Sequence, residues 1–137
     1  MSRGVLIDSN VWIDVTQPNN EHHAWSRARV RAAMLAGTAR INPLIYAEVS
    51  AGFADEQTLD RFLQRAAVVR EVLPYAAAFP AMRAFRENRK RGGKRTSPLP
   101  DSYIGAHAEA AGHTLLTRDA ARFRTYFPEV ELVTPDS

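Results

Sequence analysis

A short apolar run near the start of the chain ends in an aspartate, and this junction constrains the fold more than any other feature. Gly4 to Ile7 is apolar, Asp8 follows it directly, and a helical pattern begins at Val11. This pattern predicts a buried strand with a carboxylate at its tip. Open α/β sheets bind their ligands at the carboxyl ends of the strands. We therefore expect Asp8 to lie at the binding edge of such a sheet.

Short strands alternate with helices along the rest of the chain. Strands are expected over residues 4–8, 38–41, 68–73, 113–117 and 130–133. Helices are expected over residues 9–16, 21–36, 44–53, 55–66, 75–89, 101–111 and 119–127. Such alternation is typical of parallel sheets with right-handed crossovers. The sequence therefore predicts an α/β fold as a single domain over residues 1–137: a three-layer α/β/α sandwich with a central, mostly parallel sheet of four or five strands.

Several helix ends have signals in the sequence. Ser9 or Asn10 is placed to cap the first helix, Gly37 to end the second, and Asn42 with the proline after it to begin the third. Pro80, inside the helix expected over residues 75–89, predicts a kink or a later start.

Apolar spacing predicts which helix faces are buried. In the helix over residues 21–36 the expected buried stripe recurs every three or four residues, at Trp25, Ala28, Ala32 and Leu35. The aromatic residues on apolar stripes are expected to pack in the core or in a dimer interface, and they are Trp25, Phe62, Phe79 and Phe85.

The composition excludes several kinds of site. The chain has no cysteine, which excludes disulfides, zinc–thiolate sites and cysteine nucleophiles and allows a reducing compartment. No apolar run approaches the roughly 18 residues of a membrane span, and Asp8 and Asp14 interrupt what would be a signal-peptide core. We therefore expect a cytoplasmic protein with no membrane contact.

The net charge of +3 is unevenly distributed. Residues 83–95 carry seven lysines or arginines against one glutamate, so the other 124 residues sum to −3. Such a segment is typical of a surface that binds a polyanion, because Lys and Arg that neutralise phosphates release counterions. A solvated run of charges explains it equally well. The candidate contact residues in this segment are Arg89, Lys90, Arg91, Lys94 and Arg95.

Four carboxylates lie at comparable junctions of the predicted fold. Asp8 ends the first strand, and Glu48 lies in the helix after the second. Asp101 opens the helix that follows the basic loop, and Asp119 follows the strand that ends at Thr117. Because the carboxyl ends of parallel strands lie along one edge of the sheet, the four side chains can converge on one pocket.

Clustered carboxylates favour a cation among them, because they repel one another when ionised. Mg²⁺ or Mn²⁺ suits oxygen ligands with no cysteine and no evident histidine. These ions activate water and neutralise charge on a phosphate. Together with the basic segment, the four acids predict a metal-dependent nuclease that needs no serine or histidine nucleophile.

Each acid also has a structural explanation. Asp101 and Asp119, taken singly, fit helix caps, and Glu48 fits any exposed helical position. Asp8 is harder to explain in this way, since a buried aspartate is unfavourable unless it is paired or liganded. The prediction therefore depends on the four acids together.

Four segments carry a resemblance to a known family, and they run from Leu6 to Asp14, Tyr46 to Val49, Pro100 to Ala108 and Leu115 to Asp119. In this order they resemble a PIN-domain ribonuclease, more narrowly a VapC-type toxin of a bacterial toxin–antitoxin pair. By this resemblance the metal-binding and catalytic acids fall on Asp8, Glu48, Asp101 and Asp119. Ser9 or Asn10, and Thr117, would be the polar residues that support them.

The resemblance also implies partners. They are Mg²⁺ or Mn²⁺ as cofactor, single-stranded or structured RNA as substrate, a second copy of the chain in a homodimer, and a cognate antitoxin whose C-terminal segment blocks the site. The basic loop over residues 90–100 is more arginine-rich than the family requires, and it contacts RNA phosphates, an acidic antitoxin tail or solvent alone. His22 and His23 match no ligand of the family and are expected at an exposed helix start.

Two other functions stay open at this point. The first is a non-catalytic module that binds nucleic acid or a partner through a degenerate acidic pocket. The second is a metal-dependent phosphatase acting on small substrates, for which the basic segment would be unnecessary.

Overall fold

A parallel sheet forms the centre of the computed structural model, which describes residues 3–91 and 99–136. Its strands are Val5–Ile7 (β1), Ala39–Ile41 (β2), Val69–Arg70 (β3), Thr114–Leu116 (β4) and Leu132–Val133 (β5). All four pairings are parallel, in the order β3-β2-β1-β4-β5. The predicted sheet is therefore confirmed, with five strands in the part of the chain described.

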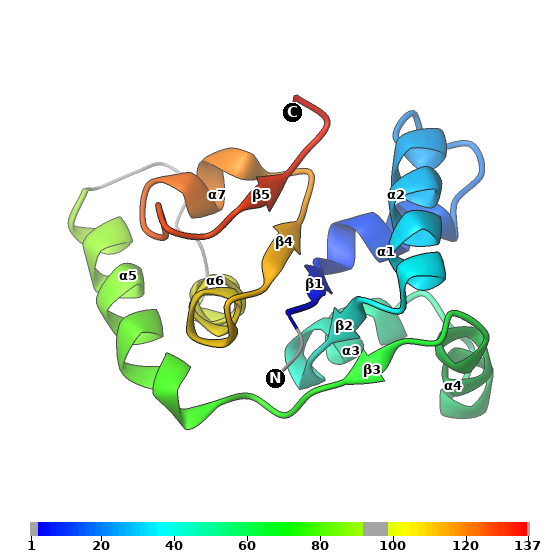
Figure 1. Ribbon diagram of the computed structural model, residues 1–137, viewed down its shortest axis with the longest axis horizontal. Coiled ribbons are helices and arrows are strands. Elements are labelled where there is room, and N and C mark those ends of the chain that lie inside the picture. Colours follow the sequence, from blue (N-terminus) through cyan, green and yellow to red (C-terminus); the bar gives the residue numbers. More distant parts are fainter. Residues whose placement is uncertain (1–2, 92–98, 137) are drawn as a thin grey trace.

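Helices flank the sheet on both sides (Figure 1). They are Ser9–Val15 (α1), His23–Ala36 (α2), Pro43–Ser50 (α3), Glu56–Arg65 (α4), Ala78–Lys90 (α5), Leu99–Ala111 (α6) and Ala120–Arg124 (α7), with a 3₁₀ turn at Tyr75–Ala77 (η1). In Figure 1, α2 and α4 lie on one side of the strands and α5, α6 and α7 on the other. The predicted three-layer α/β/α sandwich is confirmed. None of the helices in the described part of the chain is long and apolar enough to cross a membrane.

The ends of β1 and β4 are joined directly. Leu6 pairs with Leu115 and Ile7 with Leu116, and beyond them the Asp8 amide donates to the Leu116 carbonyl at 2.9 Å. The backbone therefore brings the two strand ends to the same place at the carboxyl edge of the sheet.

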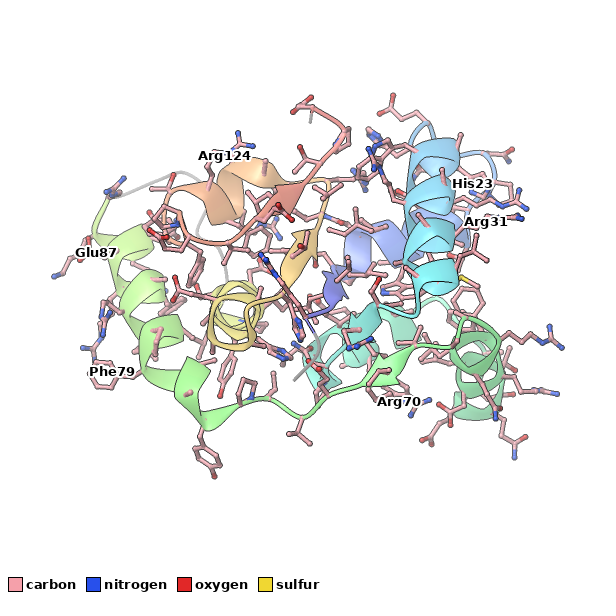
Figure 2. The ribbon with its side chains drawn as sticks, in the orientation of Figure 1. His23, Arg31, Arg70, Phe79, Glu87 and Arg124 are labelled. Atoms are coloured by element: carbon pink, nitrogen blue, oxygen red, sulfur yellow. The ribbon has the colours of Figure 1, made fainter. Side chains whose placement is uncertain are left out.

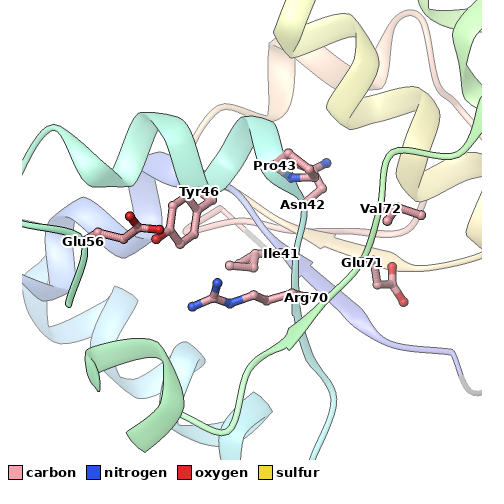
Figure 3. Close-up of a pocket in the computed structure, with 8 residues that line it drawn as sticks. All are labelled: Ile41, Asn42, Pro43, Tyr46, Glu56, Arg70, Glu71 and Val72. Carbon is pink, nitrogen blue, oxygen red and sulfur yellow. The ribbon is translucent and has the colours of Figure 1, made fainter. Parts of the chain in front are cut away.

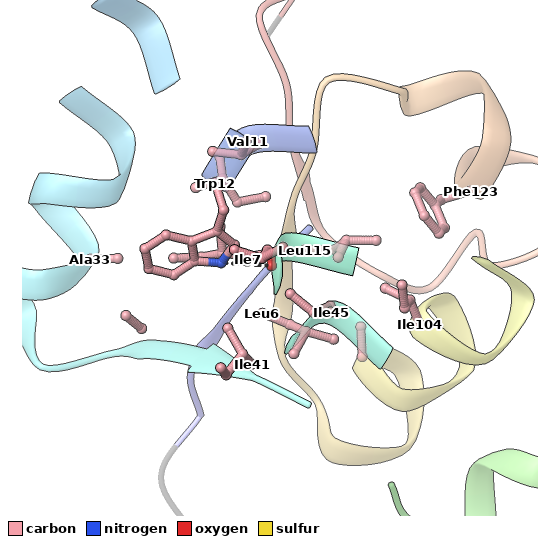
Figure 4. Packing of buried hydrophobic residues seen from close by; sticks show 14 of the residues in the cluster. Leu6, Ile7, Val11, Trp12, Ala33, Ile41, Ile45, Ile104, Leu115 and Phe123 are labelled. Carbon is pink, nitrogen blue, oxygen red and sulfur yellow. Dashed lines mark hydrogen bonds between the residues drawn. The ribbon is translucent and has the colours of Figure 1, made fainter. Parts of the chain in front are cut away.

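Trp12 anchors α1 to the sheet. Its side chain is fully buried, and its indole N–H donates to the Ile7 carbonyl at 3.1 Å (Figure 4). Its ring meets that of Phe62 edge-on, with centroids 6.0 Å apart. Complete burial of a large side chain stabilises a fold by about 1.5–3 kcal/mol. These contacts of Trp12 hold α1 against the sheet.

Helix α2 buries a different face from the one predicted. Its buried residues are Ser26, Val30 and Ala33, whereas Ala28, Ala32 and Leu35 are exposed, Leu35 at 78%. The Ser26 hydroxyl donates to buried Asp14 at 2.7 Å. A polar contact within the core therefore decides the orientation of α2, and apolar spacing alone does not reveal it. Trp25 is half-buried against the core.

The prediction that Ser9 or Asn10 caps the first helix was wrong, whereas the predictions for Gly37 and Asn42 were right. The cap of α1 is Asp8, whose side chain accepts from the Ser9 amide. Gly37 ends α2 with φ of 71°, in the left-handed region that glycine adopts without strain. Asn42 caps α3 by accepting from the Ile45 amide at 2.9 Å.

Helix α5 packs through small side chains. Ala77, Ala81 and Ala84 are buried, while Phe79 is 76% exposed and points outward in Figure 2. Phe79 is therefore no core residue, whereas Phe62 packs against the core and Phe85 is half-buried. Pro80 lies in the first turn of α5, after η1, so of the two expectations the later start holds.

Candidate functional site

Asp8 is buried where β1 ends, at 2% exposure. Its Oδ1 accepts from the Ser9 amide at 2.8 Å, and its Oδ2 accepts from the Thr117 hydroxyl at 2.8 Å. Thr117 follows β4, the parallel neighbour of β1. The sheet register thus places a hydroxyl donor beside the Asp8 carboxylate.

Thr117 also orients the segment that carries Asp119. Its Oγ1 accepts from the Asp119 amide at 3.0 Å while it donates to Asp8. Asp119 occupies the N-cap position of α7, but its side chain makes no capping hydrogen bond. Helix capping therefore does not account for the Asp119 carboxylate.

Arg122 links Asp119 to Asp101. Its Nη1 lies 3.0 Å from Asp101 Oδ2, and its Nη2 lies 3.0 Å from Asp119 Oδ2. Asp101 is the third residue of α6, two residues later than the helix start, and is 4% exposed. One guanidinium therefore holds two of the predicted acids within reach of each other.

Glu48 approaches the same group from α3. Its side chain is exposed and accepts a hydrogen bond from the Ser9 side chain. It also lines a hollow of about 480 Å³ together with Ile13, Thr16 and Phe53. Open space therefore adjoins Glu48 on the α1–α3 side, whereas Asp8, Asp101 and Asp119 are not among the residues that line the hollow.

The carboxylates act on one another electrostatically. Burial raises the pKa of Asp8, the hydrogen bond from Thr117 opposes the rise, and the charge on Asp101 adds to it. Burial likewise raises the pKa of Glu48, to which the charge on Asp8 adds. Burial raises the pKa of Asp101, where Arg122 opposes and the charges on Glu48 and Asp119 add. The structure therefore brings the four predicted acids into one group.

This donor set suits a hard divalent cation. The four side chains present only carboxylate oxygens, which are the ligands that Mg²⁺ and Mn²⁺ prefer. The raised pKa values show that the ionised forms of Asp8, Glu48 and Asp101 lack sufficient compensation. Within residues 3–91 and 99–136, Arg122 is the cation found paired with these acids. Additional positive charge would therefore be bound favourably here.

The expected supporting residues have separate partners. Thr117 contacts Asp8 directly, and Ser9 contacts both Asp8 and Glu48. The Asn10 side chain instead accepts from the Arg118 amide at 3.4 Å. Asn10 therefore steadies the loop before Asp119 and bonds to none of the acids in the described hydrogen bonds.

The basic segment is described only in part. Arg89 and Lys90 end α5 and are exposed, and the Arg91 guanidinium lies 5.5 Å from the centre of the Tyr126 ring. Tyr126 follows α7 closely, so this end of α5 adjoins the helix that carries Arg122. Lys94 and Arg95 lie outside the described residues.

A second group of possible metal ligands shares no residue with the four acids. It consists of Glu71, His107 and His113, whose ligand atoms all lie within 4.8 Å of one another. His107 Nε2 is 3.1 Å and His113 Nε2 is 2.8 Å from the same oxygen, Glu71 Oε1. Both histidines are buried. We call this group the Glu71 junction.

Backbone and amide donors assign the tautomers in the Glu71 junction. The Gly4 amide donates to His113 Nδ1 at 2.8 Å. The Asn42 side-chain nitrogen lies 3.0 Å from His107 Nδ1. Since Asn42 Oδ1 is engaged in capping α3, its NH₂ group faces the ring. Each Nδ1 is therefore an acceptor, and each Nε2–H donates to Glu71.

These tautomers oppose metal binding at the Glu71 junction. A metal ion on Nε2 would require the proton at Nδ1, where the Gly4 amide already donates to His113. Arg40 Nε also lies 3.6 Å from Glu71 Oε2 and brings a positive charge. The junction is satisfied as a hydrogen-bonded network that ties α6 and β4 to the segment after β3.

A cavity of about 310 Å³ lies beside Glu71 (Figure 3). Its lining residues are Ile41, Asn42, Pro43, Tyr46, Glu56, Arg70, Glu71 and Val72. Arg70 lies over the Tyr46 ring at 4.9 Å and pairs with Asp60 at 2.6 Å. None of the four acids lines this cavity, so it is separate from the candidate site.

Sequence reasoning missed Arg122 and the Glu71 junction and misplaced two histidines. Arg122 lies three residues after Asp119 in α7, and this spacing could have revealed the pair. The junction has no such spacing, because Glu71 follows β3, His107 lies in α6 and His113 lies between α6 and β4. His22 and His23 are half-buried at the start of α2, not exposed as expected, and His23 Nδ1 lies 2.9 Å from the Asp14 carbonyl.

Several solved structures are similar to the chain. VapBC2 from Rickettsia felis, bound to a DNA fragment from its promoter, is 15% identical with a TM-score of 0.70, and the match covers 95% of this chain and 97% of that one. DNA-bound VapBC from Salmonella typhimurium is 17% identical with a TM-score of 0.66, covering 97% and 98%. FitAcB from Neisseria gonorrhoeae is 21% identical with a TM-score of 0.64, covering 96% and 97%. At these identities the similarity concerns the fold.

Comparison of sequences gives the family. No curated protein matches the chain. The pattern of the PIN domain family matches residues 5–127, which include all four acids, Thr117 and Arg122. The resemblance noted in the sequence is thereby confirmed, and the chain belongs to the PIN domain family.

Proposed function

We propose that the chain is a metal-dependent endoribonuclease and the toxin of a toxin–antitoxin pair. The observation that carries this proposal is the convergence of Asp8, Glu48, Asp101 and Asp119 from four separate segments into one group, in which Arg122 bonds to both Asp101 and Asp119. The charges of neighbouring acids in this group add to the rise in the pKa of Asp8, Glu48 and Asp101. Membership of the PIN domain family supports a nuclease acting on nucleic acid. The four acids are the proposed catalytic and metal-binding residues.

The residues of the chain prepare the site for a cation and a phosphate. Thr117 holds one Asp8 oxygen, Ser9 holds Glu48, and Arg122 holds Asp101. When bound by the acids, Mg²⁺ or Mn²⁺ would supply an activated water and neutralise charge on the phosphate. The hollow beside Glu48 offers space for the substrate.

RNA is the proposed substrate, and the basic end of α5 supports a polyanion. Arg89, Lys90 and Arg91 are exposed there, and Arg91 contacts Tyr126 beyond α7. A nucleic acid bound at the acids can therefore continue over this surface, where cations bind phosphates. Lys94 and Arg95 lie outside the described residues and are candidate contact residues from the sequence alone.

Protein partners are part of the proposal. Solved structures that are similar over the whole chain are toxin–antitoxin complexes, among them one from Klebsiella pneumoniae. We expect a cognate antitoxin as the protein partner. We also expect the chain to be a single domain, to form a homodimer and to act in the cytoplasm. Three large apolar side chains on consecutive segments support a protein contact, since Val72 is 82%, Tyr75 96% and Phe79 76% exposed.

Cleavage of labelled RNA tests the reaction. We expect cleavage with Mg²⁺ or Mn²⁺, none with EDTA, and none by Asp8→Asn. Cleavage that survives EDTA would rule out the metal mechanism. Failure to cleave any RNA with any metal would favour the non-catalytic binding module. Hydrolysis of a small phosphate monoester without cleavage of RNA would favour the phosphatase.

Salt dependence of RNA binding tests the basic surface. Replacing Arg89, Lys90 and Arg91 by alanine should reduce the slope of log affinity against log salt by about 2, since each phosphate contact contributes about 0.7 for a single strand. The matched control replaces three exposed arginines on α2 and α4, namely Arg27, Arg31 and Arg65. Equal slopes in both triple variants would leave the basic segment as a solvated run.

A further inference from the structure

Arg122 is the cation already present among the acids. Its Nη1 and Nη2 each lie 3.0 Å from a carboxylate oxygen, one on Asp101 and one on Asp119. The two acids come from different elements, because Asp101 lies in α6 and Asp119 precedes α7. The guanidinium therefore links the start of α6 to the segment that begins α7.

The influence of Arg122 extends beyond its two partners. Its charge lowers the pKa of Asp101, and it also lowers the pKa of Asp8 and of Glu48. Burial raises all three pKa values above their ordinary range in spite of Arg122. The Arg122 guanidinium therefore offsets only part of the negative charge of the acids. A divalent cation would offset more of it.

Arg122 and a divalent cation compete for the same oxygens. Asp101 Oδ2 and Asp119 Oδ2 face the guanidinium at hydrogen-bonding distance. An ion bridging Asp101 and Asp119 through these oxygens would lie where Nη1 and Nη2 now donate. Two cations so close would also repel each other strongly. Arg122 must therefore leave these oxygens before such an ion can bind.

We propose that Arg122 is a resident counter-cation: it positions Asp101 and Asp119 in the metal-free protein and is displaced by the divalent cation that loads the site. This inference rests on the proposed metal-dependent function. Arg122 is a positioning residue in this role, and it sets the cation concentration at which the site fills. The side chain can move away, since it is 33% exposed and lies on a short surface helix.

Binding of Mn²⁺, measured by calorimetry without RNA, tests the competition. Arg122→Gln removes the competing charge and should tighten Mn²⁺ binding by about tenfold, the effect of one charge removed at close range in partly solvated surroundings. Arg122→Lys keeps the charge, but it lacks the planar guanidinium that bonds to both acids. Its affinity for Mn²⁺ should therefore lie between those of the wild type and Arg122→Gln. Arg124→Gln, an exposed arginine of the same helix, is the control and should bind as the wild type does.

Thermal unfolding gives a second readout that does not depend on activity. Without metal, Arg122→Gln should melt below the wild type, because the acids then repel one another without compensation. Saturating Mn²⁺ should raise the Tm of Arg122→Gln more than that of the wild type, since tighter binding to the folded state stabilises it more. If Arg122→Gln does not fold, the same comparison is made with Arg122→Lys.

The outcomes separate this inference from the proposed function. Tighter Mn²⁺ binding by Arg122→Gln and Arg122→Lys than by the wild type supports displacement. Equal or weaker binding by both variants, with Mn²⁺ bound by the wild type, overturns displacement and leaves the metal-dependent function standing. Absence of Mn²⁺ binding to every variant and to the wild type overturns both.

Discussion

The hydroxyl of Thr117 donates a 2.8 Å hydrogen bond to Oδ2 of Asp8, which lies 109 residues earlier in the chain. The Thr117 hydroxyl oxygen itself accepts a hydrogen bond from the Asp119 amide at 3.0 Å. One hydroxyl thus joins the end of β1 to the segment between β4 and α7. The distance between the Asp8 and Asp119 side chains depends on this contact as well as on the sheet.

Thr117→Val tests this link with little change of shape. The variant leaves a buried Asp8 oxygen without its donor, which destabilises the fold by about 1–3 kcal/mol. Metal affinity should fall as well, because Asp8 and the Asp119 amide lose a common partner. Urea unfolding and Mn²⁺ titration measure the two effects.

Thr38→Val is the matched control, because the Thr38 hydroxyl donates to the Ala33 carbonyl at 3.3 Å, far from the acids in the fold. This variant should lose some stability and bind Mn²⁺ as the wild type does. If Thr117→Val kept full metal affinity, Thr117 would have only a structural role.

Asp8→Asn should abolish cleavage and stabilise the metal-free protein at neutral pH. Burial raises the pKa of Asp8 in the folded protein. A carboxyl of this kind favours folding while it is protonated, and its contribution is lost as pH rises through the raised pKa. The asparagine side chain does not titrate, so this loss of stability is absent from the variant, and its oxygen still caps α1. Urea unfolding between pH 4 and 8, with EDTA, should therefore show a variant whose stability declines less with rising pH.

Asp60→Asn should change the stability at neutral pH in the opposite direction to Asp8→Asn. Hydrogen bonds from Tyr46 and Arg70 lower the pKa of Asp60. Its contribution to stability is therefore present above the ordinary aspartate pKa and lost as pH falls through the lowered one. The Asp60 variant should be less stable than the wild type at neutral pH. Loss of both fold and activity in Asp8→Asn, with Asp60→Asn folded, would assign Asp8 a structural role.

The order of elements could be predicted from the sequence because it depends on local patterns. Apolar runs of strand length, glycine at the end of α2 and asparagine before Pro43 each act on their own neighbours. The burial of α2 could not be predicted in this way. The face that α2 buries includes the Ser26–Asp14 hydrogen bond, which joins two helices and leaves no periodic signal in the sequence.

The candidate site likewise has residues that the sequence predicts and residues that it does not. Asp8 and Asp119 follow β1 and β4. Glu48 lies in α3, which follows β2, and Asp101 lies in the first turn of α6, so a parallel topology predicts that all four gather near the carboxyl edge of the sheet. Arg122 was missed because Asp101, one of its two partners, is 21 residues away, and only folding places α6 beside α7. The Glu71 junction was missed for the same reason, since His107, His113 and Glu71 meet only through the packing of α6 on the sheet.

His107 should make the stability of the protein depend on pH in the mildly acidic range. Burial lowers the pKa of His107 below its usual value of 6.5, and the charge on Glu71 opposes the shift. Its neutral form therefore favours folding above pH 6.5, and this contribution is lost as pH falls through the lowered pKa. In His107→Gln, which keeps a donor for Glu71, stability should decline less between pH 7 and pH 5.

Asp8, whose pKa is raised by burial, contributes to the pH dependence with the opposite sign, so the comparison needs a second background. In Asp8→Asn the contribution of Asp8 is absent, and the effect of His107→Gln on the slope should persist there. A slope unchanged by His107→Gln in both backgrounds would show that His107 does not titrate between the folded and unfolded states in this range.

Gly105→Ala should destabilise the protein through the contact between α6 and α7. A Cβ at this position would overlap the Phe127 ring and lie 3.1 Å from Phe123 Cδ1. Overpacking of this kind costs about 1–3 kcal/mol, more than alanine gains from its helix propensity. Because α6 carries Asp101 and Asp119 directly precedes α7, the shift should move two of the proposed metal ligands apart and weaken Mn²⁺ binding.

A double variant separates overlap from any other effect of the added methyl. Phe127→Leu makes room beside Gly105, so Gly105→Ala with Phe127→Leu should be more stable than the sum of the two single changes predicts, and Mn²⁺ affinity should recover. Gly52→Ala is the control, since its Cβ would lie 3.7 Å from the nearest atom, the Val49 carbonyl oxygen. Additive effects in the double variant would show that the space between α6 and α7 does not determine the position of Asp101 relative to Asp119.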